Sequence, residues 1–159
     1  MARMTITQLI PQRSPILMVD ELLHTDGEQA HTCLTILPDN FFLSSDGTMD
    51  ESGIIEHIAQ SASAFAGHKA ILAGATEPPL GYIGEVKKFR CHHRPAVGDC
   101  LHTVVSMGVE VNGVTLLSAQ TFLVSDKSQE VTADSTLVAD TRMKIFIKSD
   151  SVNDHIIKR

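Results

Sequence analysis

The stretch Ser52–Ala73, SGIIEHIAQSASAFAGHKAILA, decides the fold, because no other segment longer than a dozen residues has the pattern of a helix. We expect Ser52 to be its N-cap, with Asp50 and Glu51 beside the positive end of the helix dipole. The many alanines and serines keep the helix slim, so that other backbone can pack closely against it. Apolar residues recur at the i, i+3, i+4, i+7 spacing of one helical face: Ile55, Ile58, Ala59, Ala62, Phe65, Ala66 and Ala70.

Glu56 is the most pointed chemical feature of this helix, a carboxylate about one turn in and flanked by isoleucines. Burial raises the pKa of a carboxyl group, whereas the dipole and a hydrogen-bonded partner lower it. Gln60 lies one turn further on, where its amide is placed to orient that carboxylate. On the residues alone, Glu56 is either such a site residue or a solvated first-turn residue that complements the dipole.

The composition is that of one globular domain: 159 residues, 43% of them apolar, with no low-complexity tract. No run of 18 apolar residues and no signal-peptide pattern occurs, so we predict a cytoplasmic protein without a membrane span. The net charge of −6 argues against general nucleic-acid binding. Cys33, Cys91 and Cys100 have no metal-type spacing and are interpreted as reduced packing thiols, and we expect no metal and no cofactor.

Two strands are predicted ahead of the helix. Residues 5–13 read as a short helix or turn, and the apolar run 16–23 suits a buried strand. Asp26-Gly27 is a hairpin signal, and the alternating segment 28–37 is the second strand. Residues 38–51 are predicted to be a loop.

The chain after the helix is predicted to be almost entirely strand. Gly74 and the paired prolines before Leu80 end the helix. Asn112-Gly113 and Asp126–Ser128 are tight turns within the meander that follows. The predicted strands are residues 80–90, 100–110, 114–125 and 129–141. We therefore predict a single domain over residues 1–142 and a polar C-terminal extension over 143–159.

The order is two strands, one long helix and an antiparallel meander of about four strands. A slim helix followed by a meander has one economical solution, in which the sheet curls around the helix. We therefore predict an α+β fold.

The chain resembles the hot-dog fold 3-hydroxyacyl-(acyl-carrier-protein) dehydratases of the FabZ type. Residues 9–20 are similar to that family's Leu-Pro-His-Arg-x-Pro-Phe-Leu-Leu-Val-Asp opening, and residues 54–60 to its Ile-Ile-Glu-x-Met-Ala-Gln helix start. The segment 81–84 looks like the divergent dehydratases of aryl-polyene-type pathways. Shorter similarities are Asn40–Phe42, Lys87–Arg90 and Val97–Asp99.

The departures from that family concern catalysis. The family carries a catalytic His in a Gly-His-Phe-Pro loop before the helix, whereas here no His occurs between His31 and His57. Gln12 stands where the opening motif has a His. His57 follows Glu56 but lies about 100° around the helix, so it is not expected to share the cavity of Glu56.

The resemblance implies roles for several residues. Dehydration needs a proton taken from C2 and a hydroxyl protonated at C3, and helix-start amides polarise the thioester carbonyl. Glu56 is thereby expected to be catalytic with Gln60 beside it, and Gly53 to lie at the substrate. The basic cluster is expected to dock an acidic carrier protein and the phosphate of its pantetheine arm, or else to be a solvated edge strand: Lys87, Lys88, Arg90 and Arg94.

The resulting prediction is a dehydratase-like protein that acts on 3-hydroxyacyl chains carried on acyl carrier protein, in fatty acid or polyene biosynthesis. The resemblance also implies a homodimer, or a heterodimer with a related hot-dog subunit. Two alternatives stay open, a catalytically silent acyl-carrier-binding subunit and a hot-dog acyl thioesterase.

Overall fold

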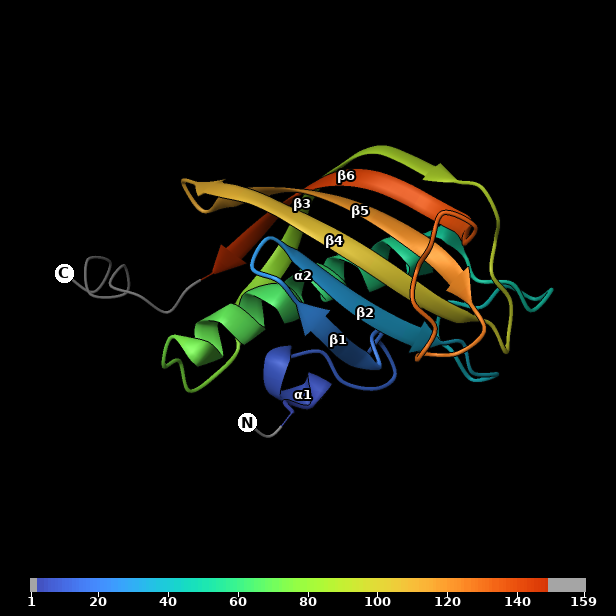
Figure 1. Ribbon diagram of the computed structural model, residues 1–159, viewed down its shortest axis with the longest axis horizontal. Helices are drawn as coiled ribbons and strands as arrows, with labels where there is room; N and C mark the ends of the chain where they lie inside the picture. The colour runs from blue at the N-terminus through green and yellow to red at the C-terminus, as the bar shows by residue number, and fades with distance from the viewer. Residues whose placement is uncertain (1–2, 149–159) are drawn as a thin grey trace.

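A computed structural model describes residues 3–148 of the chain. One long helix lies against a single curved sheet, with a short helix near the N-terminus (Figure 1). The elements in chain order are α1 (Ile6–Leu9), β1 (Glu21–Thr25), β2 (Gln29–Thr35), α2 (Glu51–Leu72), β3 (Leu80–Cys91), β4 (Cys100–Val111), β5 (Val114–Val124) and β6 (Thr136–Lys148).

The sheet has the strand order β1-β2-β4-β5-β6-β3, and every neighbouring pair is antiparallel. It curves around α2, as Figure 1 shows, and leaves β1 and β3 as its two edges. The predicted α+β arrangement of one antiparallel sheet around one central helix is therefore confirmed. The chain crosses from β2 through α2 to the opposite edge of the sheet, which places β3 beside the helix.

The N-cap of α2 is not the residue predicted from the sequence. Asp50, not Ser52, is the N-cap, and its carboxylate accepts hydrogen bonds from the backbone N–H and the hydroxyl of Ser52. These bonds lower the pKa of Asp50. A carboxylate at the N-cap also complements the positive end of the helix dipole, which a neutral hydroxyl does not.

Small residues let the sheet and α1 pack closely on α2. Ala59, Ala62 and Ala64 are buried, and Gly67 lies so close to the backbone of Leu9 that a Cβ atom there would be 2.0 Å from the Leu9 carbonyl oxygen. The predicted apolar face is buried at Ile58, Ala59, Ala62 and Phe65 and only partly covered at its two ends. Large apolar side chains from the strands fill the space around it, among them Leu34, Leu101, Val105, Leu117, Met143 and Ile145.

The first predicted strand, residues 16–23, is wrong in its extent. Met18 and Val19 are buried, but residues 16–20 form a loop, and β1 covers only Glu21–Thr25. The apolar side chains of the loop reach the core because hydrogen bonds from α2, described below, hold its backbone. Asp20 then joins the loop to β2, since its carboxylate accepts a hydrogen bond from the Thr35 N–H at 2.7 Å.

The last predicted strand is also misplaced. Residues 129–135 form a loop with a turn at its end, and β6 begins at Thr136 and continues to Lys148. Met143 and Ile145 are buried in the core, so the predicted domain boundary at residue 142 falls inside this strand. The rest of the predicted extension, residues 149–159, lies outside the described residues. The strands predicted at 28–37, 80–90, 100–110 and 114–125 agree with β2, β3, β4 and β5 to within two residues at each end.

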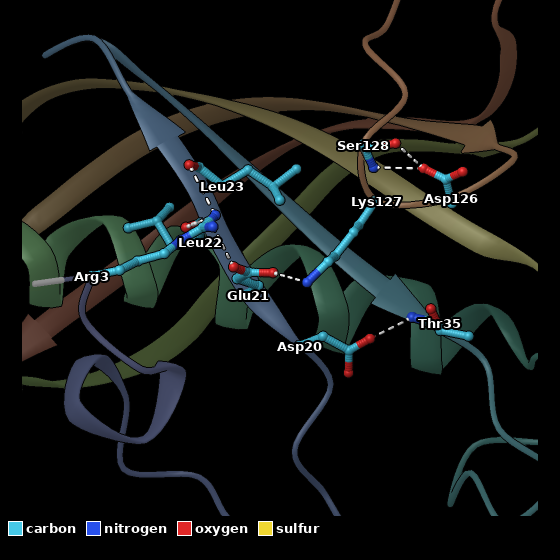
Figure 2. Close-up of polar contacts among 9 residues, drawn as sticks. All are labelled: Arg3, Asp20, Glu21, Leu22, Leu23, Thr35, Asp126, Lys127 and Ser128. Atoms are coloured by element: carbon cyan, nitrogen blue, oxygen red, sulfur yellow. Dashed lines mark hydrogen bonds and ion pairs between the residues drawn. The ribbon is translucent and has the colours of Figure 1, made fainter.

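Glu21 of β1 links two segments that lie far away in the sequence. Figure 2 shows its carboxylate between Arg3, at 2.7 Å, and Lys127 of the β5–β6 loop, at 3.2 Å. These are exposed ion pairs, and such pairs contribute little free energy. Within residues 3–148, no helix is long and apolar enough to cross a membrane.

Gly67→Ala is expected to destabilise the protein, although alanine normally stabilises a helix interior by about 1 kcal/mol relative to glycine. The new methyl group meets backbone atoms of Leu9 that cannot turn away, and overpacking of this kind costs about 1–3 kcal/mol. Urea unfolding measures the change.

Gly84→Ala is the matched control. The three atoms nearest its methyl group would all belong to the ring of Phe146, a side chain that is 45% exposed and not fixed backbone, so we expect a smaller loss of stability. A Gly67→Ala variant at least as stable as the wild type would contradict the close packing of α1 on α2.

Candidate active site

A cavity of about 220 Å³ lies between α2 and the edge strand β3. Its wall on the helix carries Glu56, Gln60 and Ser63, and its wall on the sheet is the start of β3. The structure therefore brings together the two residues predicted to be catalytic and places them at an edge of the sheet. The remaining lining comes from Gln12, Ala59, Gly81, Tyr82, Ile83 and Ile145.

Gln60 holds this wall of the cavity in place with three hydrogen bonds. Its Nε2 donates to Glu56 Oε1 and to the Ile16 carbonyl, each at 2.8 Å, and its Oε1 accepts from the Met18 N–H at 2.7 Å. The side chain is buried, so each bond replaces one that water would have supplied. One amide thus orients the carboxylate and also fixes the loop that covers it.

Glu56 is half-buried, in contrast to the fully buried Gln60 next to it. The bond from Gln60 occupies Oε1, and no other hydrogen bond to the carboxylate is present within residues 3–148. Oε2 is therefore available to exchange a proton with a ligand in the cavity.

Gln12 was not among the site residues predicted from sequence. Its Oε1 is buried and has no hydrogen-bond partner among the described residues, and the side chain lines the cavity of Glu56. The signal for it was present in the sequence, because Gln12 occupies the position at which the resembling family's opening motif has a His.

His57 does not share the cavity, as predicted. It is fully buried on the core side of α2, where Nδ1 lies 2.6 Å from the Met18 carbonyl oxygen and Nε2 lies 2.8 Å from Thr103 Oγ1. A carbonyl oxygen only accepts, so Nδ1 carries the proton and Nε2 accepts from Thr103. Burial lowers the pKa of His57 to about 4, which keeps the ring neutral.

Two polar residues of the loop before the helix, Ser44 and Asp46, are engaged within or next to that loop. Asp46 accepts hydrogen bonds from the N–H and hydroxyl of Thr48, which lower its pKa, and Ser44 Oγ accepts from Arg94. Neither lines the cavity of Glu56.

Gly53, predicted to lie at the substrate, packs against Phe42 of the loop before α2. A Cβ atom there would lie 2.5 Å from Phe42 Cβ, and its N–H donates to the Asp50 carbonyl at 2.9 Å. This amide is therefore already occupied within the first turn of α2.

The predicted basic cluster divides into two parts. Lys87, Lys88 and Arg90 lie along β3, where their side chains are exposed. Arg94 lies after the strand, and its guanidinium donates to the Met49 carbonyl and to Ser44 Oγ, each at 3.0 Å. Arg94 thus ties the loop before α2 to the segment after β3.

The other histidines lie away from the cavity. His24 stacks on His31 with ring centroids 4.0 Å apart, and His31 Nδ1 lies 2.8 Å from His102 Nε2. Burial lowers the pKa of His31 to about 4 and also lowers that of His102. No group of His, Cys, Asp or Glu side chains within residues 3–148 is placed to hold a metal ion, and the three cysteines are free thiols.

The sequence model of a family described as ApeP-like, ApeP dehydratase, matches residues 4–154. Among curated proteins, none matches the chain.

Several solved structures share the fold. The dehydratase heterocomplex ApeI:P from Xenorhabdus doucetiae superposes with a TM-score of 0.80 at 14% identity, over 99% of this chain and 100% of that one. A hypothetical thioesterase with coenzyme A from Streptococcus pneumoniae TIGR4 gives 0.59 at 8% identity, over 83% and 88%. The PaaI protein of E. coli gives 0.56 at 9% identity, over 79% and 80%. These likenesses confirm the predicted hot-dog fold.

The neutral, buried His57 makes stability depend on pH. Its pKa of about 4 in the folded state is below the value of about 6.5 expected in the unfolded chain, which therefore binds more protons between these values. The free energy of unfolding should be highest above pH 6.5 and should fall as the pH is lowered towards 4, by about 2–3 kcal/mol from this group.

Urea unfolding from pH 7 to pH 4.5 tests this expectation. His57→Gln should be less stable at pH 7 but lose less stability on acidification, whereas His93→Gln, at an exposed position, should keep the wild-type slope. An unchanged slope in His57→Gln would show that His57 does not remain neutral in the folded protein.

Proposed function

This chain belongs to the family of ApeP-like dehydratases, and from that premise we propose that it acts on 3-hydroxyacyl thioesters with Glu56 as the acid–base group. The observation that carries the proposal is the carboxylate of Glu56, held by Gln60 at the wall of a cavity between α2 and β3. The elimination removes a proton from C2 and the hydroxyl from C3, so that a C2–C3 double bond and one water form. Glu56 serves either as the base at C2 or as the acid that protonates the leaving hydroxyl. Gln60 is a positioning residue, since it contacts the carboxylate and not the reacting atoms.

The second acid–base group is proposed to come from a partner subunit. Among the described residues that line the cavity, Glu56 is the only carboxylate, and none is a His. The cavity opens beside Gly81, Tyr82 and Ile83 at the start of β3, an edge strand that has no neighbour on its outer side within residues 3–148. Apolar side chains are exposed along this edge, including Leu80, Tyr82 and Ile83.

A hot-dog partner that pairs along β3 would cover these side chains and reach the cavity. The solved ApeI:P structure is a heterocomplex, which supports a related hot-dog subunit as the partner. A homodimer through the same edge is the other assembly compatible with this geometry.

The acyl chain is proposed to arrive on an acyl carrier protein. The chain as a whole has a net charge of −6, whereas Lys87, Lys88 and Arg90 gather positive charge along β3. Such a patch increases the association rate of an acidic partner by charge steering. Arg94 is proposed to contribute to docking as well, since it uses Nε and one N–H of Nη2 to hold the loop before α2 and is itself exposed.

One observation favours a second candidate, a silent subunit that binds the acyl carrier without catalysing the reaction. The loop before α2 has no His, and both ring nitrogens of His57 are engaged in the core. In this alternative the partner subunit would supply both acid–base groups.

Mass spectrometry of a 3-hydroxyacyl-carrier-protein incubated with the purified chain and its hot-dog partner tests the proposal. We expect loss of the mass of one water, and a reduction of about 10²–10⁴-fold in that rate for Glu56→Gln. Glu51→Gln is the matched control, because Glu51 lies in the first turn of the same helix but is exposed and outside the cavity lining.

The other outcomes are distinct. A wild-type rate in Glu56→Gln, with carrier binding retained, would favour the silent subunit. Release of the whole acyl group would identify a thioesterase.

A further inference from the structure

Two glutamine side chains line the cavity of Glu56, and their amides differ in how they are bonded. The amide of Gln60 makes three hydrogen bonds, one to the Glu56 carboxylate and two to the backbone of the loop before β1. Gln12 bonds within residues 3–148 only through its backbone, whose carbonyl accepts from Arg13 Nη1 at 2.9 Å. Its side-chain Oε1 is a buried acceptor without a donor.

The backbone around Gln12 is held in place on both sides. Arg13 donates from Nη1 to the Ile10 carbonyl at 2.7 Å and from Nη2 to the Thr7 carbonyl at 2.9 Å. Further along, Gln60 bonds the same loop at its other end. The loop would have to break these bonds to carry Gln12 out of the cavity, so a fixed backbone keeps an unbonded amide at the cavity wall.

An unbonded buried amide is costly if its role is only structural. A buried polar atom without a partner lowers the stability of the folded state, and such atoms are rare in native proteins. A methionine has a similar length and fills such a space without an unpaired polar atom. The arrangement at Gln12 therefore points to a ligand group as the missing partner.

The chemistry of the proposed substrate identifies that group. Gln12 Oε1 is an acceptor and needs a donor. In the reacting part of a 3-hydroxyacyl thioester, the carbonyl oxygen only accepts and C2 carries only C–H bonds. The C3 hydroxyl is the one donor that this part of the substrate offers, and the elimination removes it from the product.

We propose that Gln12 bonds the C3 hydroxyl and so selects 3-hydroxyacyl chains over chains that lack this hydroxyl, the unsaturated product included. This inference rests on the proposed function. The hydroxyl hydrogen points to Gln12 Oε1, which leaves the lone pairs of the hydroxyl oxygen to accept a proton from the acid of the reaction. Gln12 neither gives nor takes a proton, and it is a specificity residue. The product leaves Oε1 unpaired, which favours its release.

Calorimetric titration of the full chain with its hot-dog partner tests this selection. The two ligands are a 3-hydroxyacyl pantetheine amide and the same amide without the hydroxyl. Gln12→Met should reduce the preference for the hydroxyl ligand about three- to tenfold, the effect of one hydrogen bond, and should change the affinity for the other ligand less than twofold.

Ser63→Ala is the matched control. Ser63 is another uncharged polar residue of the cavity lining, but it lies seven residues beyond Glu56, which is about 10 Å along the axis of α2. Its loss should change the preference less than twofold. An equal loss of preference in Ser63→Ala and Gln12→Met would overturn the proposal, because the effect would then not be specific to Gln12.

Urea unfolding separates this role from a structural one. Gln12→Met removes an unbonded group, so the midpoint of unfolding should stay the same or rise. Gln60→Met should lower the midpoint, because it leaves the buried partners of that amide unpaired. A fall in Gln12→Met as large as that in Gln60→Met would overturn the proposal, since the amide of Gln12 would then be structural.

Failure of this inference differs from failure of the proposed function. Loss of water from the carrier-bound substrate, combined with a wild-type ligand preference in Gln12→Met, would overturn the role of Gln12 and leave the proposed function in place. A wild-type protein that shows no preference for the hydroxyl ligand would do the same if it releases water. A wild-type protein that neither binds the hydroxyl ligand nor releases water would overturn both.

Discussion

The side-chain amide of Gln60 is the interaction on which the rest of the candidate site depends. It bonds the backbone of Ile16 and Met18 and the carboxylate of Glu56, so that loop, helix and acid–base group are fixed by one side chain. His57 adds a bond to the Met18 carbonyl from the other side of the helix. A buried polar group must have its partners to avoid a loss of free energy, so this arrangement forms as a unit.

Because such long-range hydrogen bonds leave no local pattern, only part of the fold is predictable from the sequence. The helix and most strands follow from periodicity and from turns such as Asn112-Gly113, which are local signals. Residues 16–20 have strand composition, but side chains of α2 bond the backbone of Ile16 and Met18 where a neighbouring strand would, and no local sequence pattern indicates this. The start of β6 at Thr136 likewise depends on pairing with β5 and β3, which lie far away in the sequence.

In the candidate site, too, local contacts are predictable from the sequence and long-range contacts are not. Glu56 and Gln60 lie one helical turn apart, so their contact follows from the helix alone. Gln12 enters the cavity only through the long-range docking of its loop. Lys88 and Arg94 are near each other in sequence, yet a bulge and a loop place them at different parts of the surface.

The central claim is that Glu56 faces the reacting carbons of a 3-hydroxyacyl chain lying between α2 and β3. The most direct measurement is a crystal structure of the chain, with its hot-dog partner, bound to a 3-hydroxyacyl pantetheine amide that cannot be turned over. The account predicts C2 or the C3 hydroxyl next to the Glu56 carboxylate, with a hydroxyl contact at about 2.6–3.2 Å. An acyl chain bound elsewhere, with Glu56 facing solvent, would contradict it.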